Sequence, residues 1–147
     1  MKRLYKLLRL TKNLPLLLRT FIIMTMIRLG LKLLAWRNLH KLVGKIVSAS
    51  PNIPKPDEIV WRRVVWAVEI VSQYMIPKPT CLARALVTHI LLAQQGYRTD
   101  LRIGVAKTQQ EKFEAHAWVE IQGQVIIGNS RNLSYFIPLP PLYQKVV

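Results

Sequence analysis

The chain has 147 residues, which is enough for one domain with a core and an extension. It carries 22 Lys and Arg against 7 Asp and Glu, a formal net charge of +15, and a single cysteine, Cys81. One cysteine excludes an internal disulfide and a cysteine-based zinc cluster, so we expect no metal, no cofactor and a reducing, cytoplasmic compartment.

The basic residues concentrate near the N-terminus. Residues 1–56 contain twelve Lys and Arg and no acid. Leu4, Leu7 and Leu8 interleave with basic residues at a helical spacing, which predicts a short amphipathic helix. We predict that residues 1–50 form a basic helical segment.

Charges also interrupt the more apolar stretch from Leu14 to Trp36. Arg19, Arg28 and Lys32 leave a longest uncharged piece of eight residues, from Thr20 to Ile27. A spanning helix needs about 20 apolar residues, and a signal peptide would not carry charges into and past its apolar run. We therefore predict neither a membrane span nor a signal peptide.

Two interpretations of the basic segment remain open. Arg37, Lys41 and Lys45 recur every four residues, so they would share one face of a helix. That face is either solvated, with its helices packed on the following domain, or it binds an anionic partner: an acidic peptide, a protein or the membrane surface. We do not expect nucleic acid, because aromatic interleaving and a known binding motif are missing.

The composition of residues 48–56, Ser-Ala-Ser-Pro-Asn-Ile-Pro-Lys-Pro, is typical of a linker. It separates the basic segment, residues 1–50, from a predicted second domain, residues 51–147. The second domain should contain most of the hydrophobic core and any chemistry.

A helix is predicted to begin after Asp57, whose side chain can cap it. Glu58 and Arg62 stand in the favourable i,i+4 order for an ion pair. Pro77 and Pro79 end the helix. Its buried face should carry the residues that share a helical period, namely Trp61, Val64, Val65, Val68, Val71 and Met75.

Cys81 follows a helix breaker and precedes an apolar-periodic run. Thr80 can cap that run, which places Cys81 in the first turn of a helix. Unpaired backbone N–H groups and the helix dipole favour an anion there, so a nucleophilic thiolate is expected, with the N–H of Cys81 as oxyanion donor. The alternative is a small buried hydrophobe. Gln73 is either a further oxyanion donor or an exposed helix glutamine.

The helix that begins at Cys81 should close at Gly96, a residue type favoured just past helix ends. His89 lies eight residues from Cys81, or about 12 Å along the axis, so it cannot reach the thiol. We interpret His89 as a packed or surface histidine, and His40 has no supporting context.

The hydrophobic period then changes to that of strands. One strand is predicted around residues 101–106, after which residues 107–114 form a polar loop. A second strand has Ala117, Val119 and Ile121 on one face and His116 with its alternate neighbours on the other. Gly123 marks a turn, and residues 124–127 form the return strand.

The turn sets the register of this hairpin. If Gln122 and Gly123 form a two-residue loop, the opposed pairs are Ile121 with Gln124, Val119 with Ile126, and His116 with Asn129. Asn129 could then bond one imidazole nitrogen and leave the other for Cys81. A three-residue loop would put Ser130 in that place instead.

Cys81, His116 and Asn129 together provide a thiol, a base and a group that fixes the base, in the order of papain-like enzymes. The predicted fold class is α+β, in which the helix bearing the cysteine packs on a small antiparallel sheet.

Several spaced blocks also resemble a known family. They are PTCLxRAL at 79–86, LRIGV at 101–105 and FxAHAWVE at 113–120, with Gly96 and Gly123 between and after them. Over about Trp61 to Ile137 the chain is similar to the transglutaminase-like leader peptidases of lasso-peptide biosynthesis. The resemblance implies a papain-like fold and removal of the leader from a ribosomal precursor, which frees the core for a separate ATP-dependent cyclase.

The resemblance carries the nucleophile over to Cys81 and the base to His116. Family members usually have an aspartate as third residue, but no acid follows Glu120 here. Asn129 must therefore serve, or the triad is incomplete. Fused relatives carry a leader-binding domain, for which this chain has no room, so it resembles the split form that needs a separate leader-recognition protein. The rival functions are a transglutaminase-like acyltransferase and a non-catalytic scaffold at a membrane surface.

Overall fold

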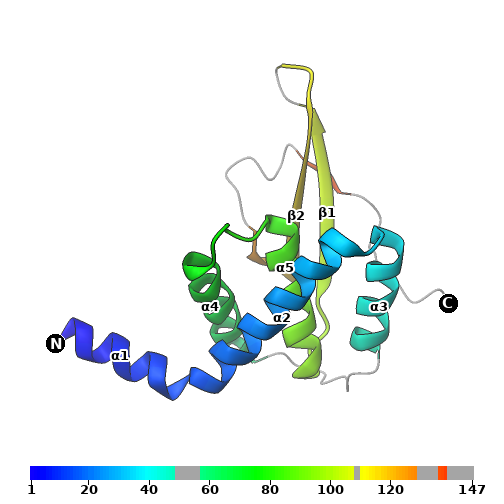
Figure 1. Cartoon of the computed structure of the whole chain (residues 1–147). Helices are drawn as coiled ribbons and strands as arrows, with labels where there is room; N and C mark the ends of the chain where they lie inside the picture. Colours follow the sequence, from blue (N-terminus) through cyan, green and yellow to red (C-terminus); the bar gives the residue numbers. More distant parts are fainter. Residues whose placement is uncertain (49–56, 108–109, 129–135, 139–147) are drawn as a thin grey trace.

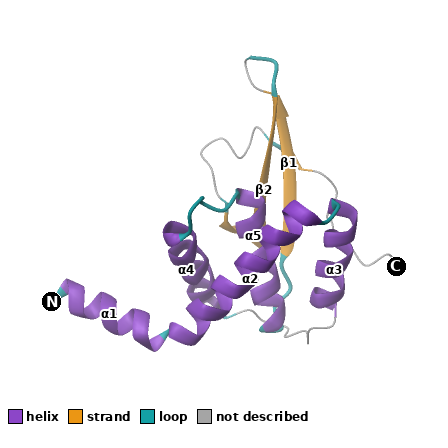
Figure 2. Cartoon of the chain, viewed as in Figure 1, coloured by secondary structure: helices purple, strands orange, loops and turns teal. Residues whose placement is uncertain are grey.

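The computed structural model describes residues 1–48, 57–107, 110–128 and 136–138 (Figure 1). Helices and a small sheet combine in a mixed α+β architecture, which confirms the predicted class (Figure 2). The described elements are α1 (Lys2–Lys12), α2 (Leu14–Leu33), α3 (Trp36–Ser48), α4 (Glu58–Tyr74), α5 (Cys81–Gln94), β1 (Asp100–Lys107), β2 (Phe113–Ile121), β3 (Gln124–Ile127) and β4 (Ile137–Pro138).

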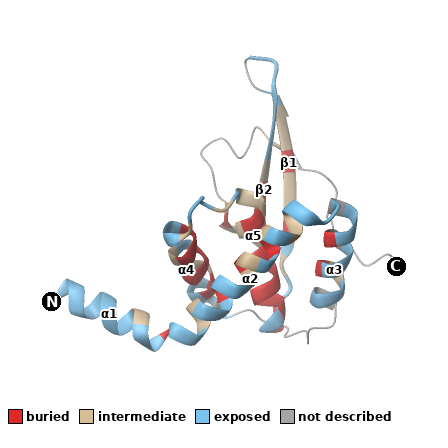
Figure 3. Ribbon diagram, viewed as in Figure 1, coloured by how far each residue is buried: buried red, intermediate tan, exposed pale blue. Residues whose placement is uncertain are grey.

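Helix α5 is the centre of the molecule. It packs on β1 and β2, and α2, α3 and α4 pack around it. Every residue from Ala85 to Ala93 is buried, so α5 is covered on all sides (Figure 3). The strands form one antiparallel sheet in the order β3-β2-β1-β4.

Local signals set the helix boundaries as predicted. The Asp57 carboxylate accepts a hydrogen bond of 2.9 Å from the N–H of Ile59, and Arg62 pairs with Glu58 at 2.6 Å. The Thr80 hydroxyl accepts from the N–H of Ala83 at 3.2 Å. These bonds satisfy backbone donors that a helix leaves free at its first turn.

Helices α2 and α3 share one hydrophobic core with α4 and α5. Met24 and Ile27 of α2, and Leu39 and Val43 of α3, belong to the same hydrophobic cluster as α4 and α5. Helix α1, which the structure describes throughout, has no buried residue. The predicted boundary falls in residues 49–56, outside the described part of the chain, and it stays a prediction.

Helix α2 continues through the charges that interrupt it in the sequence. Its 20 residues are long and apolar enough to cross a membrane by length and composition, a test that core helices of soluble proteins also pass. The count of uncharged residues did not predict this helix length. Thr20, Met24 and Ile27 of α2 are buried against the rest of the fold.

The β2–β3 hairpin has the predicted two-residue turn. Gln122 and Gly123 have φ of 50° and 82°, and Ile121 lies opposite Gln124. A register shift between Val119 and Glu120 then places Val119 opposite Ile127. The predicted pair of Val119 with Ile126 is therefore wrong, because a bulge adds one residue to a strand without changing the turn.

Candidate active site

A cleft of about 240 Å³ lies where the start of α5 meets β2 and the end of β3. It brings together Cys81 and His116, the two residues that the sequence analysis selected as nucleophile and base. The other residues that line it are Glu69, Arg84, Ala85, Ala117, Ile126, Ile127 and Gly128.

Cys81 is the first residue of α5 and is half-buried. The Thr80 cap uses one of the free N–H groups of this first turn, and it fixes where the helix begins. The thiol therefore lies beside the positive end of the helix dipole. Because Cys81 lines the cleft, a substrate can reach it.

His116 is held by a backbone carbonyl. Its Nε2 lies 2.5 Å from the oxygen of Gly128. A carbonyl oxygen only accepts hydrogen bonds, so Nε2 must carry the proton and donate it. In the neutral ring the lone pair then resides on Nδ1, which leaves that nitrogen able to act as a base.

Gly128 can fill this role because it has no side chain. Its φ is +84°, in the left-handed region, and a Cβ there would lie 2.7 Å from the Ala117 carbonyl oxygen and 2.9 Å from Cβ of Trp118. The sequence did not predict a role for Gly128, because the acceptor is its backbone carbonyl and not a side chain. The sequence did contain one signal for this contact. Gly128 directly follows β3, the strand that pairs with the strand of His116.

Two aromatic rings flank the imidazole. The ring centroids of Trp118 and Phe136 lie 6.1 Å and 5.5 Å from that of His116. Gly104, opposite His116 on β1, leaves room for them, since a Cβ there would come within 2.8 Å of the Trp118 ring and 2.9 Å of Cβ of Phe136. The glycine in the LRIGV block therefore shapes the surroundings of the base.

Trp118 is fixed in turn by polar contacts. Its Nε1 donates a 2.9 Å hydrogen bond to Glu120 Oε1, and Arg102 Nε lies 3.5 Å from Glu120 Oε2. The indole thus cannot swing away without losing a partner. These contacts fix the Trp118 side chain, against which both His116 and Gly128 pack.

Opposite charges meet in the cleft. Arg84 Nη2 lies 3.8 Å from Glu69 Oε1, and both side chains are partly exposed. Arg84 Nε is buried and has no hydrogen-bond partner among the described residues.

Other predicted residues lie elsewhere. Gln73 is exposed on α4 and is not among the residues that line the cleft; Glu69, one turn earlier on that helix, lines it instead. Asn129 and Ser130 lie outside the described residues, so the choice between them stays a prediction. Within the described residues, no three His, Cys, Asp or Glu side chains gather as a metal site.

His89 belongs to the core, as one of its two interpretations proposed. It is buried on α5, and its Nδ1 shares a hydrogen bond with the Thr99 hydroxyl. Burial removes water from the charged imidazolium and lowers the pKa of His89 to about 4. The ring is therefore neutral at neutral pH.

Comparison with known families gives one match. Residues 21–140 match the family model of the transglutaminase-like superfamily. No curated protein and no solved structure matches the chain.

Proposed function

Because the chain belongs to the transglutaminase-like superfamily, we propose that it is a cysteine peptidase that removes the leader from a ribosomally made lasso-peptide precursor. Enzymes of this superfamily are generally cysteine peptidases or acyltransferases. The observation that supports a cysteine mechanism is the cleft that Cys81 and His116 line together, with the ring of His116 bonded to the Gly128 carbonyl.

In this mechanism Nδ1 of His116 takes the proton of the Cys81 thiol. The thiolate attacks the carbonyl carbon of the scissile peptide bond, and the N–H of Cys81 stabilises the oxyanion. The C–N bond breaks as His116 returns its proton to the departing amine. Water then adds to the thioester with His116 as base, the C–S bond breaks, and the leader leaves with a new carboxylate.

The substrate class rests on the resemblance of the PTCLxRAL, LRIGV and FxAHAWVE blocks to lasso leader peptidases. The core would leave with a free N-terminus, the group that a partner cyclase needs to form a macrolactam. A separate leader-recognition protein would present the precursor.

The test begins with a search beside the gene for a short reading frame that encodes a precursor and for a leader-recognition protein, and it supplies both to the chain. In water labelled with ¹⁸O, the wild-type chain should release a leader whose new carboxylate carries the label. A leader joined to an added primary amine would instead identify acyl transfer. Mass spectrometry of both fragments distinguishes the two outcomes.

His116→Ala should lose cleavage, because it removes the proposed base. The control at another histidine is His89→Gln, since His89 is buried on α5 outside the cleft. It should cleave at nearly the wild-type rate. If folded Cys81→Ala cleaved the precursor as fast as the wild type, the proposed peptidase mechanism would be refuted.

A further inference from the structure

Helix α2 is apolar on two opposite faces. Thr20, Met24 and Ile27 are buried against the fold. The opposite face carries apolar side chains at helical spacing that are 49–79% exposed, and we name it the α2 stripe: Leu18, Phe21, Ile22, Met26, Leu29 and Leu33. At 1.5 Å per residue it extends about 22 Å. A monomer in water rarely exposes so long an apolar surface without a use for it.

Helix α1 presents a second exposed apolar face. Figure 1 shows α1 projecting from the body of the molecule. Its Arg9 guanidinium lies 4.7 Å from the centroid of the Trp66 ring on α4, and Tyr5, Lys6 and Leu10 line the same hollow. This contact places the basic side of α1 against α4. The α1 stripe, which consists of Leu4, Leu7 and Leu8, therefore points away from the body, and each member is 58–63% exposed.

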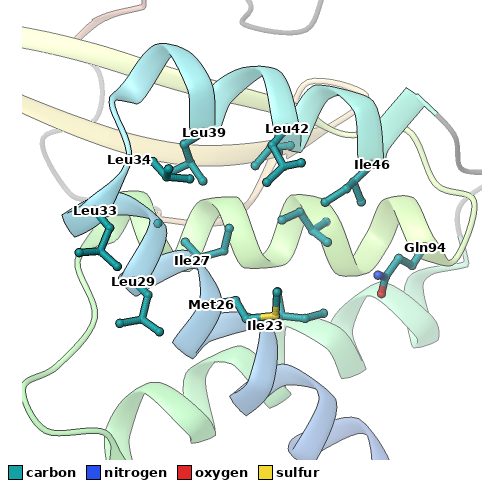
Figure 4. Close-up of a pocket in the computed structure, with 13 residues that line it drawn as sticks. Ile23, Met26, Ile27, Leu29, Leu33, Leu34, Leu39, Leu42, Ile46 and Gln94 are labelled. Atoms are coloured by element: carbon teal, nitrogen blue, oxygen red, sulfur yellow. The ribbon is translucent and has the colours of Figure 1, made fainter.

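An apolar groove extends the α2 stripe toward α3 (Figure 4). The groove, of about 570 Å³, lies between α2, α3 and α5 and shares Met26, Leu29 and Leu33 with the stripe. Leu42 of α3 lines its far side and is half exposed. The apolar surface is thus wider than one helix and opens into a space that hydrocarbon can enter.

Charge identifies the occupant. On a helical projection, Arg19 lies at one margin of the α2 stripe, and Arg28 and Lys32 lie at the other. No acidic residue occurs before Asp57 to oppose them. An anionic bilayer offers apolar chains beneath negative headgroups, so it satisfies the stripe and its basic margins together. An acidic peptide would satisfy the charges and leave most of the two stripes in water.

We propose that α1 and α2 lie in the headgroup region of an anionic membrane, with both stripes facing the acyl chains. α2 has the length and composition to cross a bilayer, but crossing would remove Thr20, Met24 and Ile27 from their contacts with the fold. Lying along the surface keeps those contacts and buries the opposite face. This proposal is independent of the chemistry in the cleft.

Flotation with lipid vesicles tests it on the full chain. The wild type should float with vesicles of phosphatidylcholine mixed with phosphatidylglycerol. Binding to phosphatidylcholine alone should be weaker by about tenfold or more, and rising salt should weaken binding to the mixed vesicles, because headgroup attraction is screened. Equal binding to both vesicle types, or no binding to either, overturns the proposal.

Substitutions locate the binding face. The triple variant Phe21→Ser, Met26→Ser and Leu29→Ser should lose about tenfold or more in binding, since each serine withdraws apolar area from the acyl chains. The matched control replaces three exposed apolar residues outside α1 and α2, by Ile59→Ser, Tyr74→Ser and Phe113→Ser. It should bind as the wild type does.

Circular dichroism establishes that both triple variants fold. Wild-type binding by the folded stripe variant overturns the proposal, as does equal loss in the control. Light scattering without lipid tests whether a second copy of the chain, instead of a membrane, covers the α2 stripe. A dimer that the stripe variant abolishes would assign the stripe to self-association and likewise overturn membrane docking.

Discussion

Helices α5 and α2 are both apolar, yet the fold uses them in opposite ways. α5 is surrounded by the sheet and three helices, whereas α2 is buried on one face and exposes apolar residues on the other (Figure 3). The difference corresponds to their charges. α5 carries a single one, Arg84, near its start, whereas Arg19, Arg28 and Lys32 recur along α2. An apolar helix that keeps cations at its margins is suited to an interface rather than to a core.

The comparison also separates two tasks. α5 carries Cys81 at its first turn and fixes it by burial of the turns that follow, so it supports precise chemistry. α2 packs on α4 and α5 through its inner face but contributes no residue to the cleft, and its outer face presents a surface. If this division holds, changes at the start of α5 should affect catalysis alone, and changes on the outer face of α2 should affect docking alone.

The largest expected effect is on the reaction itself. Cys81→Ala and His116→Ala should each reduce precursor cleavage by several powers of ten, because each removes a group that reacts. Vesicle binding should remain unchanged in both. Single-turnover cleavage and flotation of the same preparations check this, and a variant that lost both properties would break the division between the two regions.

The next largest effect concerns stability. Leu86 on α5 is fully buried, so Leu86→Ala should lower the free energy of unfolding by about 2–5 kcal/mol. Leu29→Ala, the matched change on the α2 stripe, should alter it by no more than about 0.5 kcal/mol. Denaturant unfolding measures both. A large loss from Leu29→Ala would mean that the outer face of α2 packs on the fold and is not an interface.

Stability should also depend on pH through α5. The pKa of His89 is about 4 in the fold and 6.5 when unfolded, so between these values the unfolded chain binds more protons. The contribution of neutral His89 to the free energy of unfolding is fully present above pH 6.5. It is lost as pH falls through 4, by up to about 3 kcal/mol. Denaturant unfolding of His89→Gln across this range should show a shallower pH dependence than the wild type. If the free energy of unfolding depended on pH identically in the two proteins, His89 would not be the cause of that dependence.

Local sequence signals predicted the helices well. Asp57, Thr80 and Gly96 mark helix ends through hydrogen bonds or backbone conformations that depend on the residue itself. Cys81 and His116 were selected from the sequence for a similar reason, since only particular side chains can act as nucleophile or base, and both line one cleft. Their arrival in one cleft depends on the packing of α5 against β2, which the predicted α+β fold included.

Other features left no such mark. The bulge between Val119 and Glu120 depends on how β2 and β3 twist against each other, and no residue type requires it. Every residue has a backbone carbonyl, so the sequence does not indicate that the carbonyl of Gly128 contacts His116. The cleft contains Glu69 rather than Gln73 because one helical turn changes which side chain reaches it.

The smallest expected effects on cleavage concern the group that orients the His116 ring, which is either the Gly128 carbonyl or the Asn129 side chain. Nε2 of His116 has one proton, and the Gly128 carbonyl already accepts it. We therefore expect Asn129 to contribute less than the sequence predicts. Gly128→Ala should slow cleavage by roughly tenfold to a hundredfold, because a Cβ would meet the Ala117 carbonyl and turn the acceptor away. Asn129→Ala and Ser130→Ala should each cost less than Gly128→Ala.

A readout other than rate distinguishes positioning from damage to the fold. Alkylation of Cys81 by iodoacetamide at mildly acidic pH reports the thiolate, which depends on a well-oriented His116. Gly128→Ala should slow this alkylation while vesicle binding by the α2 stripe stays at the wild-type level. If folded Asn129→Ala slowed both cleavage and alkylation more than Gly128→Ala, the side chain and not the carbonyl would orient the ring. The triad would then be complete in the form that the sequence predicted.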